Sequence, residues 1–150
     1  MYESLMMSTT SNLSAPMSQN QAIKWAFLGA HLSARFHRLV AKLFGQDYRL
    51  GELEQARHGK AIHSSREAGI QSVALKAIRG SEGRSQDFDR HFRPLQQHTR
   101  SRWENIARAM ANGVPLPAVE LVKTGESYYV RDGNHRISVG LRVSNIELTK

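Results

Sequence analysis

A strand, a turn and a second strand follow one another in the C-terminal third of the chain, and this pattern limits the possible folds more than any other. Residues 118–123 form an apolar segment behind two prolines, Thr124-Gly125-Glu126 is a turn signal, and residues 127–131 form a second strand pattern. Two strand-forming runs joined by turn residues predict a β-hairpin. Its second strand leads directly into Asp132-Gly133.

Two further elements are predicted upstream of this hairpin. Residues 70–78 read as a strand, and Arg79-Gly80-Ser81-Glu82-Gly83-Arg84 reads as the loop that ends it. Ser101 followed by Glu104 is a capping-box signal for a helix that ends at Gly113. The buried face of that helix is predicted to hold Trp103, Ile106, Ala107 and Met110.

Residues 21–44 predict a long helix, because apolar side chains recur at steps of three and four. They are Trp25, Leu28, Leu32, Phe36, Leu39 and Leu43. A neighbouring stripe carries Lys24, His31, Arg35, Arg38 and Lys42. We expect the apolar stripe to pack on the domain and the basic side to face solvent. A basic amphipathic helix also suits nucleic acid or a membrane surface, and both alternatives stay open.

The amino-acid composition limits the possible domain organisation and the kinds of binding partner. We expect a disordered tail at 1–20, a helical arm and linker at 21–69 and one domain at 70–150, since 40% apolar residues suffice for one core. A net charge of +8 favours polyanionic partners. The absence of cysteine excludes disulfides and catalytic thiols. With neither a secretion signal nor an apolar run long enough to cross a bilayer, a cytoplasmic location is expected.

The turn Gly133-Asn134-His135-Arg136 has the chemistry of a phosphate site. A glycine that opens a helix leaves backbone N–H groups free and points the positive end of the helix dipole at an anion. The three side chains add an amide, an imidazole and a forked guanidinium. A competing interpretation is a strand over residues 136–143, where apolar and polar residues alternate and Asp132-Gly133 only reverses the chain.

Residues 116–123 and 128–139 together resemble the core of the ParB N-terminal and sulfiredoxin-like superfamily. The resemblance implies an α/β fold with a small mixed sheet and flanking helices. It also implies that a strand leads into a Gly-x-His-Arg turn, which opens a helix and holds nucleotide phosphates. It extends upstream to the strand at 70–78, the loop at 80–84 and the helix with Trp103, so it covers roughly residues 70–150. In the predicted loop, Arg79, Ser81 and Arg84 either close over the phosphates from the other side or belong to a solvated loop, and both interpretations stay open.

The chain differs from the superfamily at two points, and each difference argues against one of the superfamily's functions. Sulfiredoxins have a catalytic cysteine where this chain has Asn134, so sulfinic acid reductase activity is not expected. Partition proteins continue into a DNA-reading domain, whereas this sequence stops at Lys150, so a complete partition protein is not expected. The first hypothesis is therefore a module that binds ATP, ADP or CTP and acts with DNA or a DNA-associated partner through the basic arm. A homodimer is left open.

Asp132 supports a second hypothesis. The acid-first motif Asp-Gly-x-His-Arg resembles the free serine kinases of the superfamily, in which the corresponding aspartate takes part in phosphoryl transfer. Asp132 would then accept a proton or hold Mg²⁺, with Glu120 as the second carboxylate, in a small-molecule kinase, a nucleotide hydrolase or a nuclease. The alternative is that Asp132 caps the following helix and Glu120 is a surface residue. The other histidines show no metal-ligand spacing, so no zinc or iron site is predicted.

Overall fold

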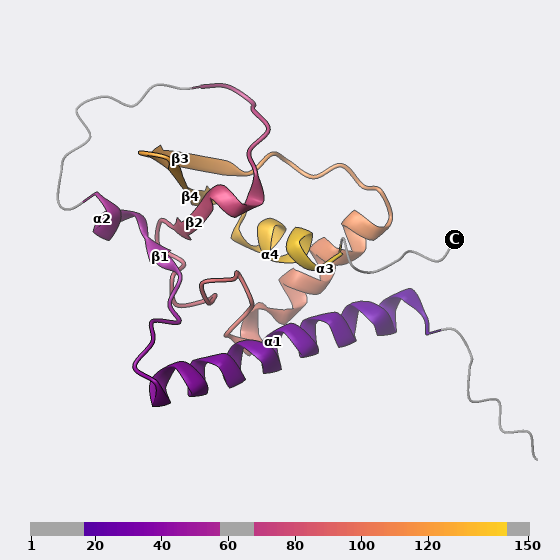
Figure 1. The fold of residues 1–150 in the computed structure, drawn as a ribbon. Helices are drawn as coiled ribbons and strands as arrows, with labels where there is room; N and C mark the ends of the chain where they lie inside the picture. Colours follow the sequence, from indigo (N-terminus) through magenta and orange to yellow (C-terminus); the bar gives the residue numbers. More distant parts are fainter. Residues whose placement is uncertain (1–16, 58–67, 144–150) are drawn as a thin grey trace, which may run out of the picture.

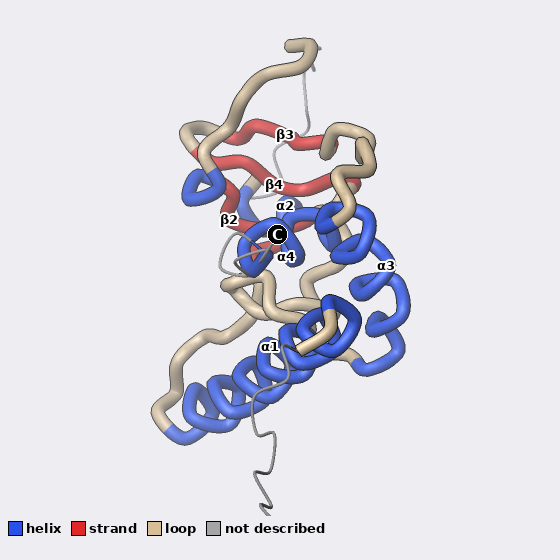
Figure 2. Tube along the Cα trace, turned by 90° about the vertical axis from the view of Figure 1, so that its right-hand side faces the viewer, coloured by secondary structure: helices blue, strands red, loops and turns tan. Residues whose placement is uncertain are grey.

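The computed structural model describes residues 17–57 and 68–143, which form three layers (Figures 1 and 2). A sheet lies on one side, helices α3 (Arg100–Ala111) and α4 (Asn134–Val143) lie in the middle, and helix α1 (Gln19–Leu43) crosses the far side. The predicted tail up to residue 16, the linker residues Gly59, Ser64 and Ser65, and residues 144–150 lie outside the described residues. In the described parts of the chain, no helix has the length and apolar character needed to span a membrane.

The sheet is mixed and has the strand order β1-β2-β4-β3. Strands β1 (Gly51–Glu52), β2 (Ile78–Ser81) and β4 (Ser127–Asp132) run parallel, and β3 (Glu120–Thr124) pairs antiparallel with β4. Three short helices complete the description: α2 (Leu53–Ala56), η1 (Leu75–Ala77) and η2 (Gln97–Thr99). The mixed α/β class and the hairpin predicted from the sequence are therefore confirmed.

The strand predicted at 70–78 is in the wrong place. Strand β2 begins only at Ile78 and includes Arg79, Gly80 and Ser81, which the sequence assigned to a loop. Within β2, position 80 requires glycine, because a Cβ there would collide with the carbonyl oxygen of Gly51 on the neighbouring strand. A glycine that signals a loop in the sequence instead permits two strands to approach closely.

The helix starts also differ from the capping signals. Helix α3 begins at Arg100, Ser101 is exposed, and Glu104 accepts a hydrogen bond from Arg100 Nε at 2.6 Å, so the predicted capping box at Ser101 is wrong. A capping box does occur at α1, where Ser18 and Gln21 bond reciprocally. Helix α1 consequently starts within the segment predicted to be a disordered tail.

Residues 134–143 form a helix, and the competing strand interpretation is wrong. The alternation arises because α4 is buried on two sides. Ile137 joins the core beneath the sheet, with Phe88 and Val130, while Val139 joins a second core between the helices. Residues two positions apart lie about 200° apart around a helix, so a helix between two cores shows the same period as a strand.

Helix α1 packs through a different face from the one predicted. Phe27 meets the ring of Trp103 edge-on at 5.6 Å, within the core between the helices. The buried side chains of α1 are Ile23, Phe27, Ala30, His31, Ala34 and Ala41. The predicted core stripe faces outward instead, with Trp25 61% and Leu43 75% exposed. Ile23 and Phe27 of α1 pack with Trp103 and Ala107 of α3, and the predicted stripe remains on the outer side.

Candidate anion-binding site

The predicted phosphate turn lies at the carboxyl ends of β2 and β4, which run parallel and so end at the same edge of the sheet. The loop that follows β2, residues 82–87, stays beside β4 because the Glu82 amide donates to the Val130 carbonyl at 2.9 Å. The Arg131 Nε also donates to the Glu82 carboxylate at 2.8 Å. Open α/β sheets bind ligands at this kind of edge.

Gly133 makes the sharp change from strand to helix. Its φ of +106° lies in the region that favours glycine, and a Cβ would come within 2.6 Å of the Val119 Cγ1 atom. Helix α4 begins at the next residue, and its first backbone bond runs from the Ile137 amide to the Gly133 carbonyl at 3.0 Å. No residue in the described ranges accepts a hydrogen bond from the amides of Asn134, His135 or Arg136. Three donors at the positive end of α4 are therefore available to an anion.

Two buried side-chain atoms at the same place have no hydrogen-bonding partner. Asn134 and His135 are only 6% and 8% exposed, yet Asn134 Oδ1 and His135 Nε2 are unpaired within the described part of the chain. Buried polar atoms are nearly always hydrogen-bonded, since each one left unpaired costs about 1–3 kcal/mol. Unpaired atoms beside unpaired amides make the start of α4 the candidate ligand site of the described residues.

The surroundings of His135 are positively charged. Burial lowers the pKa of its imidazole to about 4, and the Arg102 and Arg84 guanidinium groups add to the effect. The ring meets Phe88 edge-on at 5.1 Å. His135 is consequently neutral at pH 7, and its Nε2 donates or accepts according to the tautomer.

Arg84 and Arg102, whose charges lower the pKa of His135, belong to different elements. Arg84, in the loop predicted to close over the phosphates, donates to the Asp87 carboxylate at 3.0 Å and its side chain is 54% exposed. Arg102 belongs to α3 and was not predicted. A basic residue in the first turn of a helix opposes the helix dipole, and this unfavourable position is the signal in the sequence that points to Arg102.

The Arg136 guanidinium, which the sequence predicted to hold phosphate, is bonded to other protein groups at this turn. Its Nη1 donates to the carbonyl oxygens of Pro117 at 2.6 Å and Ala118 at 3.0 Å, and its Nη2 pairs with the Asp132 carboxylate. The guanidinium therefore fastens the segment before β3 to the start of α4. Asp132 pairs with this guanidinium and, among the described residues, caps no helix amide.

Two other residues predicted to hold phosphates, Ser81 and Arg79, form no hydrogen bond with the start of α4 among the described residues. Ser81 is fully buried and its Oγ donates to the Val130 carbonyl at 3.2 Å, inside the sheet. Arg79 is exposed on β2, and nothing in the described part of the chain connects its side chain to the start of α4. Of the residues predicted to hold phosphates, Gly133, Asn134 and His135 lie together at the start of α4, and the charge of Arg84 helps to lower the pKa of His135.

The two candidate catalytic carboxylates are neighbours, as Glu120 and Asp132 are directly opposite in the β3–β4 register. They do not fit a magnesium site, however. Asp132 is neutralised by Arg136, and Glu120 is exposed and contributes to raising the pKa of Arg131, after the larger effect of the Glu82 carboxylate. Across residues 17–57 and 68–143, no three histidine, aspartate or glutamate side chains gather in a way that holds a cation.

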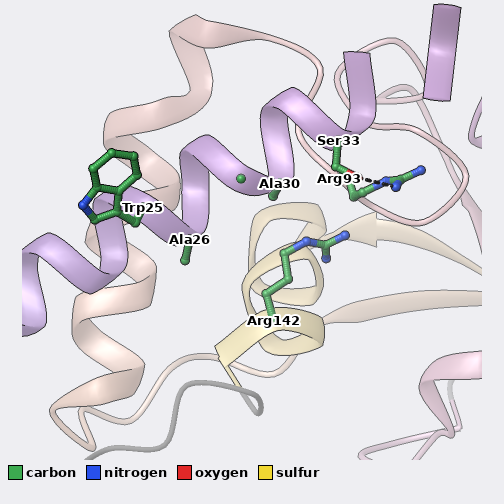
Figure 3. Close-up of a pocket in the computed structure, with 7 residues that line it drawn as sticks. Trp25, Ala26, Ala30, Ser33, Arg93 and Arg142 are labelled. Atoms are coloured by element: carbon green, nitrogen blue, oxygen red, sulfur yellow. Dashed lines mark hydrogen bonds between the residues drawn. The ribbon is translucent and has the colours of Figure 1, made fainter. Parts of the chain in front are cut away.

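A separate hollow of about 340 Å³ lies between α1 and the C-terminal end of α4 (Figure 3). Its arginines are already bonded: Arg93 to Asp89 and Ser33, and Arg142 to the carbonyl oxygens of Ser138 and His91. None of the predicted site residues lines this hollow.

The fold and the site define a small mixed α/β protein with a candidate anion site at the carboxyl edge of its sheet. Searches of protein-family models, curated proteins and solved structures find no match to this chain.

Proposed function

We propose that this protein binds a nucleotide through its phosphate groups at the start of helix α4. The proposal rests on one observation. Three backbone amides and two buried side-chain atoms, Asn134 Oδ1 and His135 Nε2, all lack hydrogen-bonding partners among the described residues at the same helix start. A phosphate group offers several acceptor oxygens and a negative charge, which suits amide donors at a helix start. Asn134 Oδ1 accepts, so it pairs with a hydroxyl or amine of the same ligand rather than with a phosphate oxygen.

The charge around the site supports an anion over a neutral ligand. Arg84 and Arg102 both act on His135, and only Asp87 opposes them among the nearby carboxylates that influence its pKa. A charge-assisted bond from arginine to phosphate contributes on the order of 1.5–3 kcal/mol. The two arginines, rather than Arg136, supply the permanent positive charge in this proposal.

One feature of this site supports the resemblance to ParB-type nucleotide-binding domains. A strand, β4, runs into a glycine with positive φ, and a helix starts immediately after it. We therefore keep the ParB and sulfiredoxin-like assignment, and binding of ATP, ADP or CTP, as parts of the proposal. The DNA or DNA-associated partner stays a prediction from the basic arm.

A thermal-shift panel of inorganic phosphate, ATP, ADP, CTP and GTP, each with and without Mg²⁺, tests the proposal. A ligand at a hundred times its dissociation constant should add about 2.7 kcal/mol to the free energy of unfolding. Arg84→Gln and Arg102→Gln should each weaken binding about tenfold or more. Arg79→Gln is the matched control and should leave the affinity unchanged. No shift with any compound, or an equal loss in the control, would overturn the proposal.

A nucleotide-dependent enzyme is the second candidate, favoured by the register that places Glu120 opposite Asp132. The Arg136 contact with Asp132 makes binding without turnover the better-supported function. The variant Asp132→Asn distinguishes the two candidates. If the wild type turns over a nucleotide and Asp132→Asn binds it without turnover, the order of the two candidates is reversed.

A further inference from the structure

The outer face of α1 carries a continuous apolar stripe that the domain does not cover. We define the outer stripe as Trp25, Leu32, Phe36, Leu39 and Leu43, which are between 56% and 75% exposed. They lie within about 40° of one line along the helix, given 100° per residue, and extend over about 27 Å. Phe44, 73% exposed, lies just beyond the end of the helix.

This stripe is not a misplaced core face, because α1 already has one. Ile23, Phe27 and Ala34 lie about 180° away from the stripe and are at most 2% exposed. Both views place α1 at the edge of the molecule, with α3 and α4 between it and the sheet (Figures 1 and 2). Soluble proteins seldom leave large contiguous apolar patches exposed, and such patches mark interaction sites.

The charges of α1 indicate what the stripe meets. Residues 19–43 contain Lys24, Arg35, Arg38 and Lys42 and no aspartate or glutamate. Lys24, Arg35 and Lys42 lie about 70–90° from the centre of the stripe, all along the same edge, and all three are exposed. The partner must therefore accept large apolar side chains and carry negative charge beside them.

Three kinds of partner differ in how they meet these two requirements. A nucleic acid satisfies the basic edge but gains nothing from exposed leucines along its phosphate backbone. A second copy packed antiparallel would cover the stripe, but it would set basic edge against basic edge. A bilayer with anionic headgroups takes up the apolar side chains at the acyl boundary and pairs with the lysines and arginines.

We propose that α1 is a membrane-surface helix, which docks the protein on anionic phospholipid through the outer stripe and its basic edge. In this orientation the sheet and α1 lie on opposite sides of the helical layer, so the sheet points away from the lipid (Figure 1). The proposal does not depend on nucleotide binding.

The test uses the full chain with phosphatidylcholine vesicles that either contain or lack phosphatidylserine, measured by co-sedimentation. Binding should occur to the anionic vesicles and weaken with added salt. Trp25 offers a second readout, since it is 61% exposed whereas Trp103 is fully buried. The emission of Trp25 should shift to shorter wavelength on binding and become protected from an aqueous quencher.

Matched variants assign the binding to the stripe. Leu32→Ser with Leu39→Ser should weaken binding about tenfold for each leucine. Ile70→Ser with Leu75→Ser removes two other exposed apolar side chains and should bind like the wild type. Lys24→Gln with Lys42→Gln should cost about fivefold for each charge. Unchanged far-ultraviolet circular dichroism and thermal unfolding would show that the stripe variant is folded.

Several outcomes would overturn the proposal. These are an absence of binding to anionic vesicles at low ionic strength, and an equal loss in the Ile70 and Leu75 control. A dimer in light scattering that disappears in the stripe variant would identify a second copy as the occupant. DNA binding that the charge variant loses and the stripe variant keeps, without vesicle binding, would identify nucleic acid.

Discussion

The start of α4 and the outer stripe of α1 both hold groups that have no partner among the described residues, and the two kinds of group are opposite. At α4 the unpaired groups are polar, few and nearly fully buried. On α1 they are apolar, extended and exposed. The first arrangement suits a small ligand that completes hydrogen bonds, and the second suits a broad surface that excludes water. One compact protein thus presents two surfaces that call for different partners.

The largest expected effect concerns the turn that creates the α4 site. Gly133→Ala should lower the free energy of unfolding by about 3 kcal/mol, because positive φ strains alanine and the new Cβ meets Val119. Gly113→Ala is the matched control, since Gly113 also has positive φ but has open space around it. It should cost about 1 kcal/mol in the same urea titration. Equal losses would remove the Val119 contact from the explanation.

An intermediate effect should appear in the pH dependence of stability. The unfolded His135 side chain takes up a proton as the pH falls through 6.5, whereas the folded one resists until about 4. The unfolded state therefore binds more protons in this window, and stability falls as the pH falls from 6.5 towards 4. We expect the wild type to lose about 2 kcal/mol more than His135→Gln between pH 7 and pH 4, allowing for solvent screening. Parallel urea curves for the two proteins would contradict the burial of a neutral imidazole.

The smallest effect separates a structural serine from a ligand-binding one. Ser81→Ala should cost about 1 kcal/mol of stability, because it removes the hydrogen bond from Ser81 Oγ to the Val130 carbonyl. Its affinity for phosphate or nucleotide should equal that of the wild type in the thermal-shift assay. A substantial loss of affinity would return Ser81 to the site, as the sequence had suggested, and would extend the polar region at α4 to β2.

The elements that the sequence predicted well depend on local chemistry. The hairpin forms because Gly125 adopts the positive φ of its turn between two strand-forming runs, and both signals are contained in a dozen residues. The errors in the fold come from residues whose role depends on distant neighbours. Gly80 looks like a loop residue until Gly51 is placed against it, and the alternation after Arg136 looks like a strand until α4 is placed between two cores.

The candidate site was predicted in part for the same reason. Gly133, Asn134 and His135 follow one another in the chain, so the start of α4 was visible as a motif. Arg102, whose charge lowers the pKa of His135, lies on another helix, and no spacing in the sequence connects the two residues. Arg136 has the right chemistry for phosphate, but the carbonyl oxygens of Pro117 and Ala118 occupy its Nη1 group.

The sequence alone therefore determined which backbone conformations are easy at each point: a long N-terminal helix, a hairpin, and a glycine turn at the end of the second strand. Only the tertiary structure decided which faces of those elements are covered. Helix propensity and turn preference act over a few neighbouring residues, whereas burial depends on which elements meet in space. That is why α1 was predicted as a helix but with the wrong face buried.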